Sequence, residues 1–156
     1  METTIEAITP HRKRTIAAVP TAVIAAVVVG DVASTIIAAI AHGAGVSHAF
    51  PPLQFATYTA LIVLAVIVGS LGWQLVRSRA TNPSRLLTRL VPLVLLLSFV
   101  PDILVGINKS ETATTWGGVI ALMAMHIVVA GAAVGSYLHF LPVGPVDGRP
   151  QSDTNR

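Results

Sequence analysis

The sequence predicts an all-α polytopic membrane protein, a bundle of four transmembrane helices with both termini in the cytoplasm. Three observations predict this fold: 53% of the 156 residues are hydrophobic, only 11% are charged, and the mean hydropathy is +0.75. A soluble domain carries charge on roughly a quarter of its residues and has too little interior for so much aliphatic material. The composition therefore excludes an ordinary soluble domain, a disordered chain and a fibre.

Four apolar stretches are long enough to cross the hydrocarbon core, which takes about 20 residues. The predicted helices cover about 15–41, 53–76, 86–107 and 116–141, which together form a transmembrane domain over 15–141. Breaks rich in Pro, Gly or polar residues separate these helices, since such residues do not continue an apolar helix easily. A basic cytoplasmic segment, 1–14, precedes the domain, and the polar residues 142–156 are expected to form a disordered cytoplasmic tail.

The positive residues predict the orientation, because Lys and Arg beside short loops are retained on the cytoplasmic side. Nine of the ten fall at the termini or in the second break: Arg12, Lys13, Arg14, Arg77, Arg79, Arg85, Arg89, Arg149 and Arg156. Only Lys109 falls in a loop on the opposite side of the membrane. We expect a multi-pass protein of the plasma membrane that contacts the lipid bilayer, and no nucleic-acid partner. The first apolar run is too long for a signal peptide.

Three ionisable residues lie inside predicted helices: Asp31, Asp102 and His126. An aspartate at the centre of a membrane helix costs about 2.5–3.5 kcal/mol on insertion scales. Such residues therefore usually face the interior of the protein and usually have a function. Counted inward at about 1.5 Å per residue, Asp31 and His126 lie about 15 Å below the outer helix ends and Asp102 about 7 Å. All three therefore belong to the outer half or the midplane.

Helical phase places other polar residues beside these three, since residues three or four apart share a face. The predicted contacts of a bound substrate are Thr35, Gln54, Tyr58, Ser98, Thr115 and Trp116. If the polar stripes face one another, they form an outward-opening polar cavity that is closed below and is approached from outside or from the outer leaflet. Pro101 is expected to bend its helix beside Asp102. Trp73, Trp116, Tyr137 and Phe140, near helix ends, are expected to be interfacial anchors or, for Trp116, the rim of the cavity.

Two carboxyl groups with a histidine are suited to general acid–base chemistry, because burial and mutual repulsion separate the protonation of the two acids. Asp31, Asp102 and His126 are therefore the candidate catalytic residues. The alternative is that Asp31 and His126, at matched depth, form a buried pair that only stabilises packing. The chain has no cysteine and no nucleotide-binding or metalloprotease motif, so we expect no metal and no cofactor.

The last predicted helix also carries a small-xxx-small pattern, Gly131 and Gly135, on the face nearly opposite His126. Either this helix is central in the bundle or the glycine face joins two copies in a homodimer. Ala26 and Gly30 form a similar pair on the first helix.

Two runs resemble a known family. Leu-Leu-Leu-Ser-Phe-Val-Pro-Asp at 95–102 and Ala-Leu-Met-Ala-Met-His-Ile-Val-Val-Ala at 121–130, with Thr114 and Thr115 between them, are similar to an actinobacterial family of small four-helix integral membrane proteins of unknown function. The resemblance covers about 15–141 and implies the four-helix fold. It brings no established activity, and Asp31 lies outside the matching runs.

Two functions remain open from the sequence. The first is an enzyme that binds a lipophilic small molecule and isomerises it, cyclises it or opens its epoxide by acid–base chemistry. The second is a non-enzymatic membrane subunit for proton-linked transport or for assembly of a larger complex, in which Asp31 is a protonation switch. No inverted repeat is evident, which disfavours a transporter that acts alone.

Overall fold

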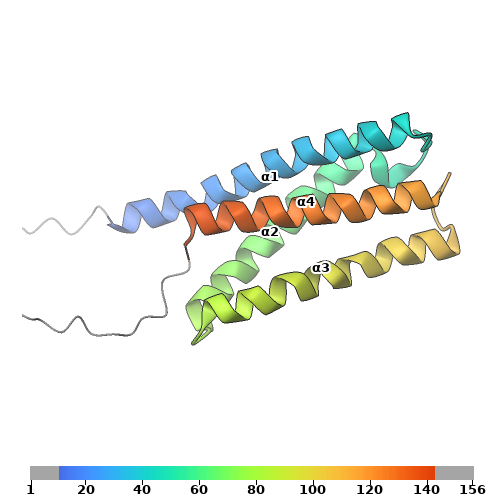
Figure 1. Ribbon diagram of the computed structural model, residues 1–156. Coiled ribbons are helices and arrows are strands. Elements are labelled where there is room, and N and C mark those ends of the chain that lie inside the picture. Colours follow the sequence, from blue (N-terminus) through green and yellow to red (C-terminus); the bar gives the residue numbers. More distant parts are fainter. Residues whose placement is uncertain (1–10, 143–156) are drawn as a thin grey trace, which may run out of the picture.

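The computed structural model describes residues 11–142, with side chains from Ala18 onward. It contains four long helices (Figure 1), α1 (His11–Gly43), α2 (Phe55–Arg79), α3 (Pro83–Asn108) and α4 (Trp116–Phe140), and a short 3-10 helix, η1 (Pro51–Leu53), before α2. The all-α, four-helix fold is confirmed. Each helix begins and ends within four residues of its expected bounds. The basic segment before His11 and the expected disordered tail after Pro142 lie outside the described residues.

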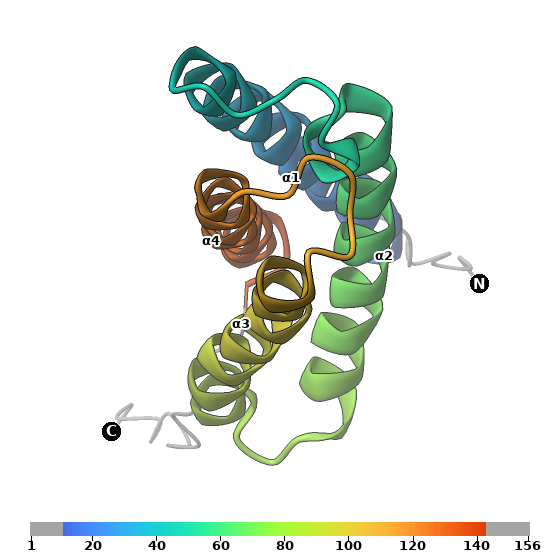
Figure 2. The ribbon, with the colours of Figure 1, turned by 90° about the vertical axis from the view of Figure 1, so that its right-hand side faces the viewer.

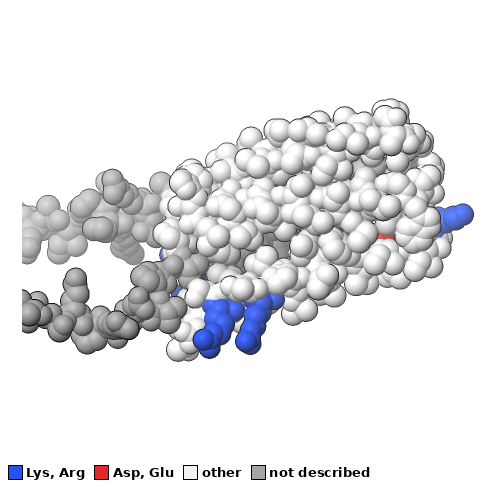
Figure 3. All heavy atoms as spheres, in the orientation of Figure 1, with Lys and Arg blue, Asp and Glu red and all other residues white. Residues whose placement is uncertain are grey.

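The surface of the bundle is that of a membrane protein. Each helix contains a run of 25 or 26 consecutive residues that is long and apolar enough to cross a membrane. Leu, Ile and Val side chains from all four helices are exposed. On the face in Figure 3, Lys and Arg lie towards the two ends of the molecule and the middle carries none. The apolar middle is suited to lipid, because a helix pairs most of its backbone polar groups within the chain.

Small residues bring α1 against α4. The buried positions of α1 recur every fourth residue, which is the spacing of one ridge on a helix: Ala22, Ala26, Gly30, Ser34 and Ala38. A Cβ on Gly30 would lie 3.4 Å from Val129 Cγ2 on α4. The pair of small residues predicted at Ala26 and Gly30 therefore serves packing within the chain, where α4 lies between α1 and α3 (Figure 2).

The two ends of the bundle are built differently. At one end, here called the Phe50 end, the fully buried ring of Phe50 rests on Gly118, whose Cβ would lie 2.8 Å from Phe50 Cε1. Trp116 packs on Gly106 in the same way, which brings α3 close to α4. At the opposite end, here called the Asn82 end, the turn between α2 and α3 crosses from one helix to the other.

Helix α2 is inclined to the other three. It begins beside α1 at the Phe50 end and slants to meet α3 at the Asn82 end (Figures 1 and 2). As a result, α2 contacts α3 and α4 only sparsely, whereas α1 and α4 pack along most of their length. The inclination leaves a space between α2 and the α3–α4 pair.

Candidate functional site

A cleft of about 700 Å³ occupies the space beside α2, and we call it the lateral cleft. Its walls are mostly Leu, Val, Ile and Ala side chains of α2, α3 and α4, and it runs from Tyr58 towards the Asn82 end, where Trp73 and Tyr137 line it. Leu64 and Val94, on the two sides of the opening, are each more than half exposed. The cleft therefore opens sideways, between α2 and α3, at the level where a bilayer surrounds the protein.

The shape and polarity of this cleft differ from the expected cavity. We expected a polar cavity in one half of the bundle, formed by four polar stripes and closed below. The lateral cleft is instead largely apolar and extends to the Asn82 end. The reason is the inclination of α2, which separates it from α3 and α4 over most of its length and exposes the aliphatic parts of all three helices.

His126 and Asp102 form the ionisable pair of the site. His126 lines the lateral cleft, and its Nδ1 lies 3.0 Å from Asp102 Oδ2. The Asp102 side chain is 10% exposed and that of His126 38% exposed, so the imidazole stands between the carboxyl group and the cleft. Asp102 reaches this position because α3 packs closely on α4 through Gly106 and Trp116.

The hydrogen bonds of the imidazole assign its proton. Nδ1 also lies 2.9 Å from the carbonyl oxygen of Leu122, which can only accept a hydrogen bond. Nδ1 therefore carries a hydrogen, which the Leu122 carbonyl accepts, and Asp102 Oδ2, although 3.0 Å from Nδ1, has no hydrogen-bond partner among the described residues. Fixing one ring nitrogen in this way defines the tautomer and leaves Nε2 as the nitrogen that can exchange a proton with a bound molecule.

Asp31 is hydrogen-bonded to Thr59 and not to His126, which lies at a matched depth along the helices. Its Oδ1 accepts a hydrogen bond from Thr59 Oγ1 on α2 at 2.8 Å. The expected pairing of Asp31 with His126 is wrong, because His126 lies beside Asp102 and Gly30 is the residue of α1 that packs on Val129 of α4. Asp31, one residue further on, is rotated by about 100° towards α2. The polar stripes thus divide between two interfaces, α1 with α2 and α3 with α4, and the two aspartates do not meet.

The remaining predicted contacts are scattered. Tyr58 and Ser98 line the lateral cleft, and Thr35, Gln54, Thr115 and Trp116 are not in its wall. Thr35 Oγ1 lies 3.0 Å from the Tyr58 hydroxyl, and Thr115 Oγ1 caps α4 by accepting from the Gly118 amide. Gln54 is exposed just before α2. A role for these residues in binding a substrate stays a prediction.

The family model that matches the chain is described as a family of unknown function, DUF6069, and it covers residues 14–139. The chain belongs to this family. The actinobacterial origin expected from the resemblance stays a prediction. No curated protein and no solved structure matches the chain.

Sequence reasoning missed two parts of the site in this DUF6069 protein. Trp73 and Tyr137, expected at the membrane interface, are buried against each other with ring centroids 5.4 Å apart. Their polar atoms bind inside the protein, Trp73 Nε1 to the Leu141 carbonyl at 3.3 Å and the Tyr137 hydroxyl to the Val66 carbonyl at 2.6 Å. Thr59 was the other omission. Its position one turn of α2 from Phe55 carries no signal that it meets an aspartate of α1.

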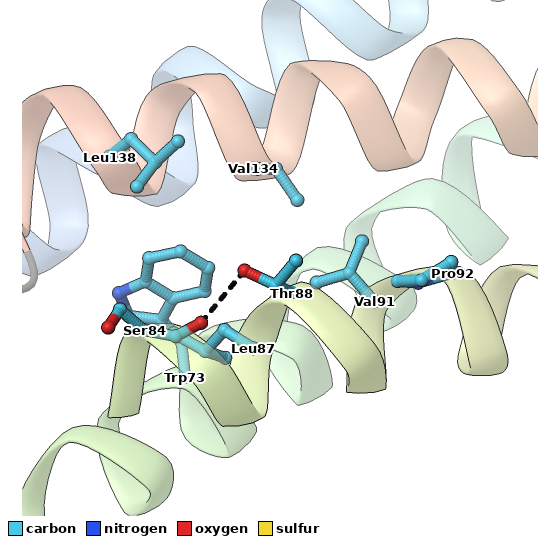
Figure 4. A pocket seen from close by; sticks show the side chains of 8 residues that line it. All are labelled: Trp73, Ser84, Leu87, Thr88, Val91, Pro92, Val134 and Leu138. Atoms are coloured by element: carbon cyan, nitrogen blue, oxygen red, sulfur yellow. Dashed lines mark hydrogen bonds between the residues drawn. The ribbon is translucent and has the colours of Figure 1, made fainter. Parts of the chain in front are cut away.

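A smaller hollow, of about 360 Å³, lies between α3 and α4 at the Asn82 end of the DUF6069 chain. Figure 4 shows Val134 and Leu138 pointing from α4 towards Thr88 and Trp73. The Thr88 hydroxyl donates to the Ser84 carbonyl at 2.9 Å, so it is already satisfied. The hollow has apolar walls and brings no ionisable group to a ligand.

Proposed function

We propose that this protein binds a lipophilic molecule in the lateral cleft, within the plasma membrane, and transforms it by acid–base chemistry at His126. The observation that carries the proposal is the position of His126, in the wall of a cleft open to lipid with Asp102 behind it. A molecule already dissolved in the bilayer enters such a cleft without crossing water. A volume of about 700 Å³ is within the range of small-molecule sites.

The chemistry assigned to the pair is a proton transfer. His126 Nε2 removes a proton from a carbon of the bound molecule, the electron pair moves to form a new double bond, and the protonated ring returns the proton at another atom. This isomerisation needs no oxidant and no second reactant, and a cyclisation or an epoxide opening begins with the ring acting as the acid. Asp102 is a positioning residue that holds the ring through Nδ1 and stabilises its charged form.

Asp31 is the third member of the proposed acid–base group, and its part is tested separately. Its hydrogen bond to Thr59 keeps it at the interface of α1 and α2, and it is not in the wall of the cleft. We therefore expect Asp31→Asn to reduce turnover far less than Asp102→Asn does.

The experiment is mass spectrometry of small molecules that co-purify with the protein in mild detergent, followed by turnover of the compound found. His126→Ala is expected to bind the compound yet to lower turnover by about 100-fold or more, because general acid–base catalysis contributes that much. His139 is an exposed histidine at the other end of α4, so His139→Ala is the matched control and should keep full activity.

The role of Asp102 is tested by two further variants. Asp102→Asn should lower turnover and shift the pH profile of turnover, and Asp102→Glu should restore part of the lost turnover. Bulk phospholipid in equal amounts from every variant would overturn the proposal.

The second candidate is the non-enzymatic membrane subunit. The observation that favours it is that Gly131 and Gly135 are exposed on α4, with no atom of the described residues within 4 Å of a Cβ built on either. Such a surface allows another helix to approach closely, from a second copy or from a larger complex. Native mass spectrometry of the wild type beside Gly131→Leu tests a homodimer: loss of the dimer in the variant supports it, and a monomer in both excludes it.

A further inference from the structure

Ser34 is the polar residue of the cleft wall whose hydroxyl lacks a partner. It is fully buried on α1, it lines the lateral cleft, and its Oγ makes no hydrogen bond within the described part of the chain. Ser70, Ser78 and Ser98 behave differently, since each donates to a carbonyl one turn earlier in its own helix. An unpaired buried hydroxyl costs about 1–3 kcal/mol, and the bilayer core has no water to relieve it. The unpaired hydroxyl therefore indicates that a bound molecule supplies its hydrogen-bond partner.

Three polar residues of the cleft wall lie at one level, and Ser98 is the one among them whose side chain already donates to a backbone carbonyl, that of Leu95. Ser34, Ser98 and His126 are nine or ten residues from the Phe50 ends of their helices, or about 13–15 Å. From His126 to Tyr137 the wall of α4 continues for eleven residues, about 16 Å. Trp73 and Tyr137 offer only ring faces at that far end, because their polar atoms bind to carbonyl groups of the protein. The cleft is therefore suited to a molecule with one polar group and a long apolar chain.

The charge of the wall restricts the polar group. Among the described residues, no Lys, Arg, Asp or Glu lines the lateral cleft, and the Asp102 carboxyl group lies 3.0 Å from Nδ1 of His126. A carboxylate or phosphate would meet no Lys or Arg side chain in this wall, and the Asp102 carboxyl group already lies beside the imidazole. A hydroxyl group can accept a hydrogen bond from Ser34 and donate one to His126 Nε2, so it satisfies both residues.

We propose that the lateral cleft holds a long-chain lipid alcohol, with its hydroxyl between Ser34 Oγ and His126 Nε2 and its chain extended towards Trp73. This inference rests on the proposed function, since it names the class of molecule that the cleft takes. It adds the direction of binding, with the polar group near the middle of the bundle and the tail at the Asn82 end.

Fluorescence of Trp73 tests the direction. The chain has two tryptophans, so Trp116→Phe leaves Trp73, at the tail end of the cleft, as the one emitter. The probes are two isomers of a long-chain primary alcohol, one brominated at the methyl end and one beside the hydroxyl, titrated in detergent because bromine quenches tryptophan at short range. The methyl-end isomer is expected to quench Trp73 saturably and several-fold more than the other. Trp73→Phe, which leaves Trp116 outside the cleft wall, should show no saturable quenching.

Ser34→Ala tests the polar contact, in the same Trp116→Phe background. Loss of one hydrogen bond should weaken binding of the methyl-end isomer about threefold to tenfold, whereas Ser78→Ala, at an exposed and satisfied serine, should not change it. Equal quenching by the two isomers, unchanged binding in Ser34→Ala, or tighter binding of the corresponding carboxylic acid would each overturn the inference. The proposed chemistry is tested by turnover and not by binding. If the alcohol binds as described but no co-purified compound is turned over, this inference stands and the acid–base step is overturned.

Discussion

At the residue scale, the pairing of His126 decides what the site can do. Depth along the helices matched His126 with Asp31, yet its neighbour is Asp102, 3.0 Å away. Residue counts measure position along the bundle axis and carry no information on which helices are adjacent. The close approach of α3 to α4 at Gly106 brings Asp102 to His126, and the hydrogen bond from Thr59 satisfies Asp31 elsewhere.

A double-mutant cycle distinguishes these two pairings. Asp102→Asn and His126→Gln should be non-additive, with a coupling free energy of about 1 kcal/mol or more, because the two side chains are in contact. Asp31→Asn with His126→Gln should be additive within about 0.5 kcal/mol, as for residues that share no partner. The measurement is the free energy of unfolding in mixed detergent micelles, followed by circular dichroism. Coupling of His126 to Asp31 and not to Asp102 would contradict the arrangement of the helices described above.

At the scale of helices, glycine and other small residues determine where the elements meet. The ridge from Ala22 to Ala38 lets α1 approach α4 along its length. Gly118 admits the ring of Phe50, and Gly106 admits that of Trp116. On α4, which carries Gly118, no described atom lies within 4 Å of a Cβ built on Gly131 or Gly135. A glycine in a helix can therefore allow close packing within the chain or remain exposed on the surface. Only the position of the neighbouring elements distinguishes the two cases.

Gly118→Ala and Gly131→Ala compare these two cases on α4. The Cβ of Gly118→Ala would lie 2.8 Å from Phe50 Cε1 and 3.0 Å from Cδ1, so the buried ring must shift. Overpacking of this kind costs about 1–3 kcal/mol, and the melting temperature in detergent should fall. Gly131→Ala adds a methyl group where nothing lies within 4 Å and should leave the melting temperature unchanged or higher. Equal melting temperatures for both variants would show that Phe50 does not pack on Gly118.

At the scale of the whole molecule, the arrangement of charge along the bundle predicts how it sits in the membrane. Arg77, Arg79, Arg85 and Arg89 are exposed around the turn between α2 and α3, and Lys109 is exposed at the Phe50 end. The positive-inside rule then predicts that the Asn82 end faces the cytoplasm, the side on which the sequence predicts both termini. In that orientation, the tail of a lipid in the lateral cleft points towards the inner leaflet.

Cysteine labelling tests the orientation without interference, because the chain has no cysteine of its own. Single substitutions Ser47→Cys and Ser110→Cys, at exposed positions in the two loops of the Phe50 end, should react with a membrane-impermeant maleimide on intact cells. Thr81→Cys, exposed in the turn between α2 and α3, should react only after lysis. The reverse pattern would mean that the bundle is inserted the other way.

The sequence by itself determined the class of the protein and the course of its helices. Apolar stretches of about 20 residues require a membrane, and within lipid a chain of this kind forms helices because its backbone has no other hydrogen-bonding partner. It also singled out Asp31, Asp102 and His126, since ionisable groups stand out among Leu, Val and Ala. Only the tertiary structure decided that His126 meets Asp102, that Ser34 lines the cleft and that the cleft opens sideways. These features depend on the inclination of α2 and on which ridges interlock, and long-range packing of this kind leaves almost no trace in the periodicity of single helices.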